Sequence, residues 1–425
     1  MMTAVLFISF VLLLTLNVPI SFSLLISSLI ALAYQGIPLM VMIQRVVTAA
    51  DSFILIAIPF FMLAGNLMSG GGISRALTGF ANAVVGFVRG GLAHVTVLSS
   101  MIISGITGSS VADASAIGTI MIPAMIKEGY RKDFATGLVA SATTVGVTIP
   151  PSIPFVIYGV ITGASIGKLF MGGMVPGFVF SVFAMVISFF ICRRQGVGAP
   201  KQFSLRELAR KTREGIWALL APVVILGGII GGVFTPTEAA AVGVLYALFV
   251  GFVIHKELRI KDMPQILLDS AGTTAIVMLM VVGAFLYSWI ITVDQVPQMV
   301  AHFILGISRD PVIVLFMFVG LFIVAGMFID LGANIVLLIP VLFPVTQQLG
   351  IDPVFFGVLT VVALSVGLVT PPVGASLFIT CDISKTPLMD AFKASLPYLG
   401  GVVVTMVLMI FFPEIVTYFP NLLVR

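Results

Sequence analysis

The chain has 425 residues, of which 60% are hydrophobic and 9% are charged, and its mean hydropathy is +1.22. A soluble domain carries about 25% charged residues. An apolar majority of this size cannot be hidden in one soluble core, so the composition excludes a soluble enzyme and a nucleic-acid-binding protein. Long continuous apolar runs, in place of alternating segments, also argue against a transmembrane β-barrel. We therefore expect an all-α polytopic protein surrounded by membrane lipid.

Apolar runs occur along the whole chain. A full membrane span needs ~20 residues, and many of the runs are shorter than that. Short apolar segments separated by Gly or Pro predict re-entrant hairpins and broken helices, which survive at membrane depth only around a cavity enclosed by protein. The first run lacks a positively charged start and is interpreted as a spanning helix, not as a signal peptide. The runs are 2–16, 20–35, 53–69, 73–88, 92–107, 111–126, 133–149, 153–166, 169–191, 216–233, 237–254, 266–291, 296–307, 312–329, 333–349, 354–369, 373–384 and 390–412.

Basic residues are concentrated near the middle of the chain. Residues 192–214 hold seven Lys and Arg against two Glu, and residues 255–262 are also basic. The positive-inside bias places both segments in the cytoplasm, so that residues 216–254 cross the membrane outward and back as two helices, turning at Thr235-Pro236-Thr237. Residues 205–214 are predicted to form a short amphipathic helix on the membrane surface, with a solvated charged connector as the alternative.

The two halves of the chain repeat one pattern of Gly and Pro at a constant offset of 221 residues. Gly and Pro fix backbone geometry, so their agreement is more informative than agreement between apolar residues. An odd number of membrane crossings between the copies would invert the second one, as in many secondary transporters, and we expect this inversion. The matching pairs are Gly105 with Gly326, Pro123 with Pro344, Gly129 with Gly350, Gly146 with Gly367, Pro150-Pro151 with Pro371-Pro372, and Pro176 with Pro397.

This repeat predicts the organisation of the chain. Each copy is expected to hold a re-entrant helical hairpin followed by a broken helix, and the other helices are expected to form a scaffold with connecting arms. The predicted segments are 1–91 (scaffold and arm helices), 92–191 (first transport repeat), 192–215 (basic cytoplasmic loop), 216–311 (scaffold and arm helices), 312–412 (second transport repeat) and 413–425 (C-terminal tail).

The first copy contains two interruptions that are candidate binding sites. Residues 104–113 are rich in Gly and hydroxyl groups and predict a hairpin tip, whose second arm begins near Ser110 and points N–H groups at an anion. Residues 143–152 contain Pro150 and Pro151, which lack N–H donors and release carbonyl groups four residues earlier. Released carbonyls with nearby hydroxyls form a cation site. A simple proline kink is the alternative interpretation.

The second copy repeats both features, with its tip at 325–334 and its break at 366–374. At the offset of 221 residues, Asp113 corresponds to Asn334 and Ser109 to Asp330, so each tip has one carboxylate. Ionisable residues between apolar runs are functional by default, although both Asp residues could simply cap helices. A site with at most one carboxylate suits sodium better than a divalent ion. Proton coupling through Asp330 stays as an alternative.

Several catalytic motifs are absent from the sequence. It contains no Walker loop, no H-E-x-x-H and no G-x-S-x-G, so ATP hydrolysis on this chain is excluded and an enzyme is disfavoured. A channel is disfavoured because channels usually place symmetric subunits around an axial pore.

The runs 105–113, 149–154, 174–177 and 369–374 together resemble the large membrane subunit (DctM-like) of tripartite ATP-independent periplasmic (TRAP) transporters. The resemblance covers essentially the whole chain. It implies an elevator-type, sodium-coupled importer of organic acids, such as C4-dicarboxylates or sialic acid, in the inner membrane of a bacterium. It also implies two partners, a small four-helix membrane subunit and a periplasmic substrate-binding protein. Because the chain starts at the first helix of the large subunit, we expect it to be separate from the small one. A single-component sodium/divalent-anion symporter is the alternative.

The resemblance further implies sodium and substrate sites, with at least two transported sodium ions. The sequence does not choose between a monocarboxylate and a dicarboxylate, because no Arg lies within either repeated motif. The implied sodium-site residues are Ser109, Asp113, Gly146, Ile149 and Pro151 in the first copy, and Gly326, Asp330, Gly367 and Thr370 in the second. The candidate substrate-binding residues are Ser109, Ser110, Ser152, Asp330, Asn334 and Thr370.

Overall fold

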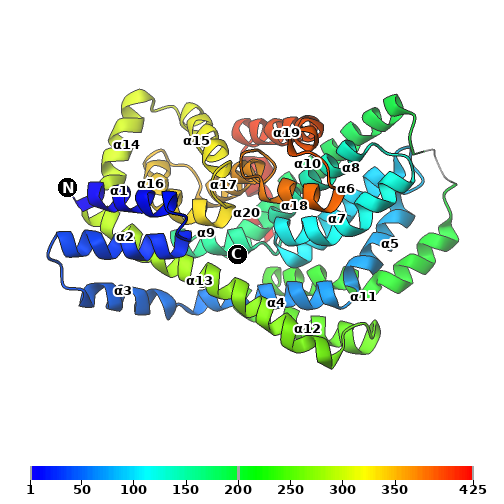
Figure 1. Ribbon diagram of the computed structural model, residues 1–425, viewed down its shortest axis with the longest axis horizontal. Coiled ribbons are helices and arrows are strands. Elements are labelled where there is room, and N and C mark those ends of the chain that lie inside the picture. Colours follow the sequence, from blue (N-terminus) through cyan, green and yellow to red (C-terminus); the bar gives the residue numbers. More distant parts are fainter. Residues whose placement is uncertain (1, 199–201, 424–425) are drawn as a thin grey trace.

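The computed structural model describes residues 2–198 and 202–423, and every regular element within these ranges is a helix (Figure 1). Seven of the described helices are long and apolar enough to cross a membrane. The predicted all-α, polytopic class is therefore confirmed. The candidate spans are Phe53–Gly70, Ile166–Gln195, Leu205–Ile230, Pro236–Ile254, Ile260–Val293, Leu331–Gln348 and Leu388–Phe411.

The predicted repeat is present as two sets of helices with matching bounds. In each set two antiparallel helices form a hairpin, a helix interrupted at its Pro-Pro pair follows, and a long helix closes the set. Shifting α7 by 221 residues gives 331–348, which are the bounds of α16. The first set is α6 (Gly91–Thr107), α7 (Ser110–Lys127), α8 (Lys132–Thr144), α9 (Ile153–Thr162) and α10 (Ile166–Gln195); the second is α15 (Pro311–Gly326), α16 (Leu331–Gln348), α17 (Pro353–Gly367), α18 (Ala375–Ser384) and α19 (Leu388–Phe411). We call these ten helices the hairpin unit.

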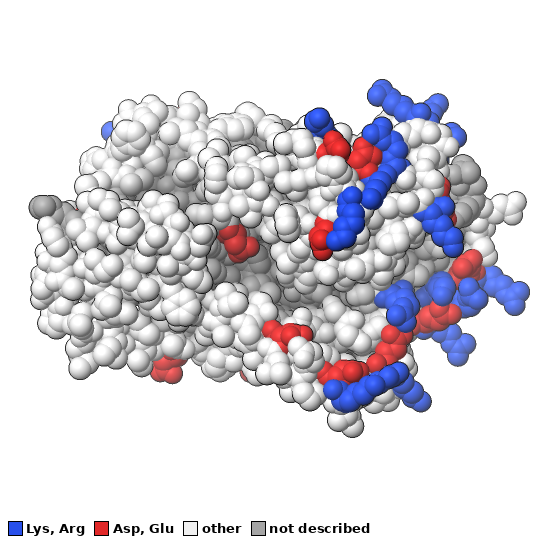
Figure 2. Space-filling model, in the orientation of Figure 1, with Lys and Arg blue, Asp and Glu red and all other residues white. Residues whose placement is uncertain are grey.

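The two sets have opposite directions in the membrane. Helix α10 ends at the basic pair Arg193 and Arg194, whereas its equivalent α19 begins beside Lys385 and contains Lys393 in its second turn. Lys and Arg side chains gather at one end of the molecule (Figure 2), which the positive-inside bias assigns to the cytoplasm. Thus α10 runs toward the cytoplasm and α19 runs away from it. The two hairpins accordingly reach the middle of the molecule from opposite ends (Figure 1).

We call the remaining helices the flanking helices. Their order along the chain and their packing are also repeated in the two copies. Helix α2 packs against α13, and in the second copy α12 packs against α4. In the second copy α13 is one long helix. The corresponding segment of the first copy is divided into α3, a 3₁₀ turn at Phe53–Ile56 and α4. The duplication thus extends beyond the predicted blocks. These helices are α1 (Met2–Thr15), α2 (Ile20–Tyr34), α3 (Met40–Ala50), α4 (Ala57–Gly70), α5 (Ile73–Val85), α11 (Leu205–Ile230), α12 (Pro236–Phe249), α13 (Met263–Val293) and α14 (Val296–Ile307).

Two segments differ from the sequence-based expectation. Residues 205–214 are not a separate surface helix, because α11 continues from Leu205 to Ile230 without a break. Its first turns are capped by the Ser204 hydroxyl, which accepts a hydrogen bond from Glu207 N at 3.3 Å. The C-terminal segment contains a further helix, α20 (Glu414–Leu423), which packs against α10.

The arm before the second hairpin is sharply bent. Helix α14 meets α15 at an angle of 119° across a short break. Asp310 caps α15 by accepting a hydrogen bond from Val312 N at 2.8 Å, and Pro311 occupies the first position of the helix, where its missing N–H costs nothing. The bend turns the chain into the hairpin and so fixes where its tip can reach.

Candidate functional site

The tip of the first hairpin lies directly on the break of the first broken helix. A Cβ atom added at Gly108 would lie 2.7 Å from the carbonyl oxygen of Pro151, and Gly108 has a φ of +62°, which favours glycine. A Cβ at Gly105 would lie 3.3 Å from the carbonyl oxygen of Pro150. The glycines are therefore needed because backbone approaches backbone here.

Asp113 forms the centre of the first site. Its side chain is fully buried, and it accepts hydrogen bonds from the hydroxyls of Ser104 and Thr107, the latter at 2.6 Å. A Cβ at Gly146 would lie 3.1 Å from Asp113 Oδ2 and would overlap Ser104 Oγ. Both hydrogen-bond partners of this buried carboxylate are neutral hydroxyls. A buried carboxylate in that setting is costly unless a cation or a proton joins it.

Backbone carbonyls at the break of the first copy accept hydrogen bonds from residues that follow closely in the chain. Ile149 N donates to Gly146 O at 3.3 Å, and the Ser152 hydroxyl donates to Val147 O at 2.5 Å. Ser152 is fully buried and replaces a donor that Pro151 lacks. The structure thus places Ser152 inside the break.

The second site holds its carboxylate differently. Asp330 Oδ2 accepts a hydrogen bond from Gly332 N at 3.0 Å, as a cap of α16, but its side chain is exposed, unlike that of Asp113. Asn334 is buried, and its side-chain amide donates to Ile329 O at 2.8 Å. Thr370 lies just beyond the end of α17, and its hydroxyl donates back to Val366 O of that helix at 2.7 Å. In this copy the carboxylate of Asp330 is therefore exposed. Asn334, the equivalent of Asp113, is buried and hydrogen-bonds to the backbone of the tip.

Helix α15 and the end of α17 meet through two glycines. A Cβ at Gly367 would lie 2.1 Å from the carbonyl carbon of Gly326 and 2.2 Å from its oxygen. Val373 N donates to Met327 O at 3.2 Å across the same contact. The end of α6 approaches Gly146 in the same way in the first copy, where Ser104 is the residue in contact.

A cavity of ≈ 270 Å³ joins the two tips. Ser109 and Ser110 line it from the first tip, and Asp330 lines it from the second. The flanking helices α4 and α13 form the opposite wall, so the cavity lies where they meet the hairpin unit; Figure 2 shows a hollow near the middle of the molecule. The lining residues are Met62, Gly108, Ser109, Ser110, Val111, Val147, Ile153, Pro154, Ile157, Thr273, Val277, Met280, Asp330, Leu331, Gly332 and Leu368.

The cavity brings together only part of the predicted substrate-binding set. Ser109, Ser110 and Asp330 line it, whereas Ser152, Asn334 and Thr370 are absent from its described lining. Ser110 also contacts the other copy, since its hydroxyl lies 2.8 Å from that of Ser376 on α18. The second arm of each hairpin packs against the second half of the other copy's broken helix, α7 on α18 and α16 on α9. These contacts bind the two copies into one body.

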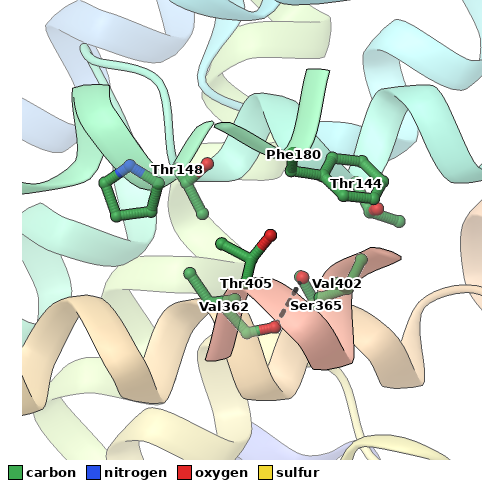
Figure 3. A pocket seen from close by; sticks show the side chains of 8 residues that line it. Thr144, Thr148, Phe180, Val362, Ser365, Val402 and Thr405 are labelled. Carbon is green, nitrogen blue, oxygen red and sulfur yellow. Dashed lines mark hydrogen bonds between the residues drawn. The ribbon is translucent and has the colours of Figure 1, made fainter. Parts of the chain in front are cut away.

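A second, much smaller cavity of ≈ 10 Å³ lies behind the breaks, between the two copies (Figure 3). Thr144 and its repeat equivalent Ser365 face it, together with Thr148 and Thr405. The hydroxyls of Thr144, Ser365 and Thr405 donate to carbonyls of their own helices at 2.8, 2.7 and 2.9 Å. This volume has room for about one water molecule. An organic molecule is too large for this cavity.

The family model for the tripartite ATP-independent periplasmic transporter, DctM component, matches residues 7–415. The chain belongs to this family. It is 40% identical over 379 residues to the sialic acid TRAP transporter large permease of Vibrio cholerae, covering 89% of each chain. It is 39% identical to the C4-dicarboxylate TRAP transporter large permease of Pseudomonas aeruginosa, over 88% of this chain and 87% of the relative. The 2,3-diketo-L-gulonate TRAP transporter large permease of Escherichia coli is 38% identical over 88% of each chain.

The fold is also found in a solved structure. The crystal structure of the YdaH transporter of Alcanivorax borkumensis superposes with a TM-score of 0.63 at 14% identity, covering 89% of this chain and 88% of that one. At this identity the likeness concerns the fold alone. As a TRAP large permease with seven or more apolar spans, the chain is an integral protein of the bacterial inner membrane.

Some residues of the site escaped sequence reasoning. Ser104 and Thr107 hold Asp113, and the only sequence signal was their place within the tip motif. Met62, Thr273 and Met280 line the cavity from helices far from either motif, and nothing in the local sequence marks them. They become visible only when the flanking helices are placed against the tips.

The glycine contact between α15 and α17 gives a test of the site's packing. We expect Gly367→Ala to lower the melting temperature of the purified chain, because the added Cβ must push α17 off Gly326, at a cost of about 1–3 kcal/mol. Gly320→Ala is the matched control, since that glycine lies on α15 with no atom within 4 Å of an added Cβ. Equal melting temperatures for the two variants would contradict this packing.

Proposed function

We propose that the chain is the transport subunit of a sodium-coupled importer of organic acids. The observation that carries the proposal is the placement of one cavity between two hairpin tips, each with a carboxylate and each resting on an interrupted helix. Sites of this kind occur at the repeat interface of secondary transporters. Membership of the TRAP large permease family supports the same class of protein.

Sodium is the coupling ion that the chemistry of the two sites favours. The first site combines the buried carboxylate of Asp113 with hydroxyl and carbonyl oxygens around Gly146. The second would combine Asp330 with the end of α17 at Gly367 and Thr370, since Leu368 between them lines the same cavity as Asp330. One carboxylate with neutral oxygens suits a monovalent cation, whereas calcium usually collects several carboxylates. Two sites imply at least two sodium ions per transport cycle.

The substrate class follows from the N-terminal ends of α7 and α16. Both helices begin at the cavity, at Ser110 and Leu331, where their dipoles favour an anion, although Gly332 N of α16 already donates to the Asp330 carboxylate. The Ser109 and Ser110 hydroxyls add hydrogen-bonding groups. The names of the relatives give sialic acid, C4-dicarboxylates and 2,3-diketo-L-gulonate as their substrates. We therefore propose a carboxylate substrate.

The position of the cavity supports an elevator mechanism. Its carboxylate and serine hydroxyls belong to the hairpin unit, whereas the flanking helices contribute Met62, Val277 and Met280 and a single hydroxyl, that of Thr273, which donates to Asp269 O within α13. A hairpin unit that moved along this wall would carry the substrate and ions with it. In that arrangement residues 1–91 and 216–311 act as scaffold and arms.

The partners are those of the family. A small four-helix membrane subunit would lie against the flanking helices and widen the scaffold. A periplasmic substrate-binding protein would deliver the acid at the face opposite the basic end. A single-component sodium/divalent-anion symporter is the second candidate, because it too would pair hairpins around a central cavity.

The role of Asp330 can be separated from capping. We expect Asp330→Asn to raise the sodium concentration for half-maximal uptake about tenfold or more, because the site loses the charge that neutralises the cation. Asp310→Asn is a matched control: Asp310 caps α15 through the N–H two residues on, as Asp330 caps α16, but lies exposed away from the tip. Asn is an adequate cap in both places. Unchanged sodium dependence in Asp330→Asn would remove this residue from the site.

Two sodium sites predict a sigmoidal dependence of uptake on sodium. We expect the initial rate in proteoliposomes to rise with a Hill coefficient above one, since both sites must fill before transport. The control replaces sodium with potassium under a pH gradient. A hyperbolic curve, or equal uptake driven by protons, would count against sodium coupling.

The need for partners separates the two candidate transporters. We expect negligible uptake by the isolated chain, none on adding the small subunit alone, and sodium-driven uptake once the substrate-loaded binding protein is also present. Each reconstitution is compared with empty liposomes. Robust uptake of free substrate by the isolated chain would instead support the single-component symporter.

A further inference from the structure

A hollow of ≈ 460 Å³ opens at the basic end of the flanking helices, far from both tips. Helices α5 and α11 and the segment after α12 surround it. Gly72 before α5, and Ala76 and Gly79 on it, border this space, and their small size leaves the hollow open. Its lining, which we call the basic hollow, consists of Gly72, Arg75, Ala76, Gly79, Lys211, Arg213, Glu214, Trp217, Ile254, His255 and Glu257.

The basic hollow has an excess of positive charge. Two of its cations already have partners, because Arg75 binds Glu257 at 3.3 Å and Lys211 binds Glu214 at 2.7 Å. Glu257 rests on Gly72, where a Cβ would meet its carboxylate, and Lys211 lies along Gly79. Arg213 is exposed and forms no ion pair with the residues that the structure describes. The three cations therefore face two carboxylates, and one guanidinium is left for an external anion.

The depth of the hollow favours a lipid as the source of that anion. Trp217 follows Arg213 by one helical turn, is 38% exposed, and marks the level at which α11 becomes apolar. Tryptophan prefers the boundary between headgroups and acyl chains. Beyond it, α11 carries no charged residue from Ala218 to Ile230 and exposes Val223. A phosphate in the hollow would thus have its acyl chains beside an apolar helix surface.

We propose that the basic hollow binds the phosphate group of an anionic phospholipid of the cytoplasmic leaflet. Arg213 supplies the free charge, since a guanidinium binds phosphate oxygens in a bidentate manner. Arg75 and Lys211 line the same space and add positive potential. Basic pockets between helices on the cytoplasmic side are suited to anionic headgroups. The site would anchor the start of α11 and the arm helix α5 to one lipid.

Trp217 itself supplies the measurement. The chain has two Trp residues, so a Trp289→Phe background leaves Trp217 as the only source of tryptophan emission. The full chain is reconstituted with increasing amounts of brominated phosphatidylglycerol or brominated phosphatidylethanolamine of the same acyl composition, and quenching is recorded. We expect half-maximal quenching at about fivefold less phosphatidylglycerol than phosphatidylethanolamine.

Variants on α11 test whether the preference belongs to the hollow. Arg213→Gln should abolish it, whereas Arg206→Gln, which removes an exposed charge outside the lining, should preserve it. Inorganic phosphate in excess should leave the quenching unchanged. Equal quenching by both lipids in the background chain, equal effects of the two substitutions, or displacement of the lipid by inorganic phosphate would each overturn the proposal.

Discussion

Backbone groups released in the middle of a membrane must find partners inside the protein, and the architecture of this chain depends on that constraint. Pro150-Pro151 and Pro371-Pro372 interrupt two helices where no water is at hand. In the first copy the Ser152 hydroxyl donates a hydrogen bond to Val147 O. In the second, Val373 N donates one to Met327 O across the tip of the hairpin. The hairpins enclose the breaks and therefore occur with them in both copies.

The two copies share a backbone but distribute their polar groups differently. Asp113 stands where the second copy has Asn334, and Ser109 stands where it has Asp330. The hydroxyls of Ser104 and Thr107 that hold Asp113 correspond to Ala325 and Phe328. The first copy thus keeps its carboxylate inside, among hydroxyls, and the second keeps its carboxylate at the cavity. The two tips share geometry but differ in the burial of their carboxylates, so the two sites proposed for sodium are not chemically equivalent.

The sequence was informative where particular residue types, such as Gly and Pro, determine the backbone geometry. Gly146 and Gly367, with the Pro-Pro pairs that follow them, predicted the repeat and the breaks, and Arg193 and Arg194 predicted the cytoplasmic end. The duplication of the flanking helices was missed because those helices match mainly through apolar residues, which coincide often in any membrane protein. A change of polarity near Glu214 suggested a helix end, yet α11 continues, because its backbone hydrogen bonds do not depend on which solvent its side chains meet.

The residues of the cavity wall could not be predicted from the sequence. Its position depends on how Met62 and Met280 meet a tip that is distant in the chain, and no local pattern encodes that contact. The same limit applies to Ser110 and Ser376, which lie 266 residues apart and touch through their hydroxyls. Such pairs follow from the inverted packing of the two copies, so they can be named only after the orientation of the repeats is known.

Polar contacts hold each body together, and apolar contacts join the two bodies. Within the hairpin unit the hydroxyls of Ser188 and Tyr398 lie 3.0 Å apart, and among the flanking helices Asn66 donates to Ser270 at 2.8 Å. Between the bodies, the methyl group of Met280 approaches Gly332, and the rings of Phe61 and Phe170 meet edge to face at 6.1 Å. Apolar packing is non-directional and is largely restored after a displacement, whereas a buried hydrogen bond loses its partner. The boundary that contains the cavity is therefore the one along which the proposed elevator movement would break the fewest directional contacts.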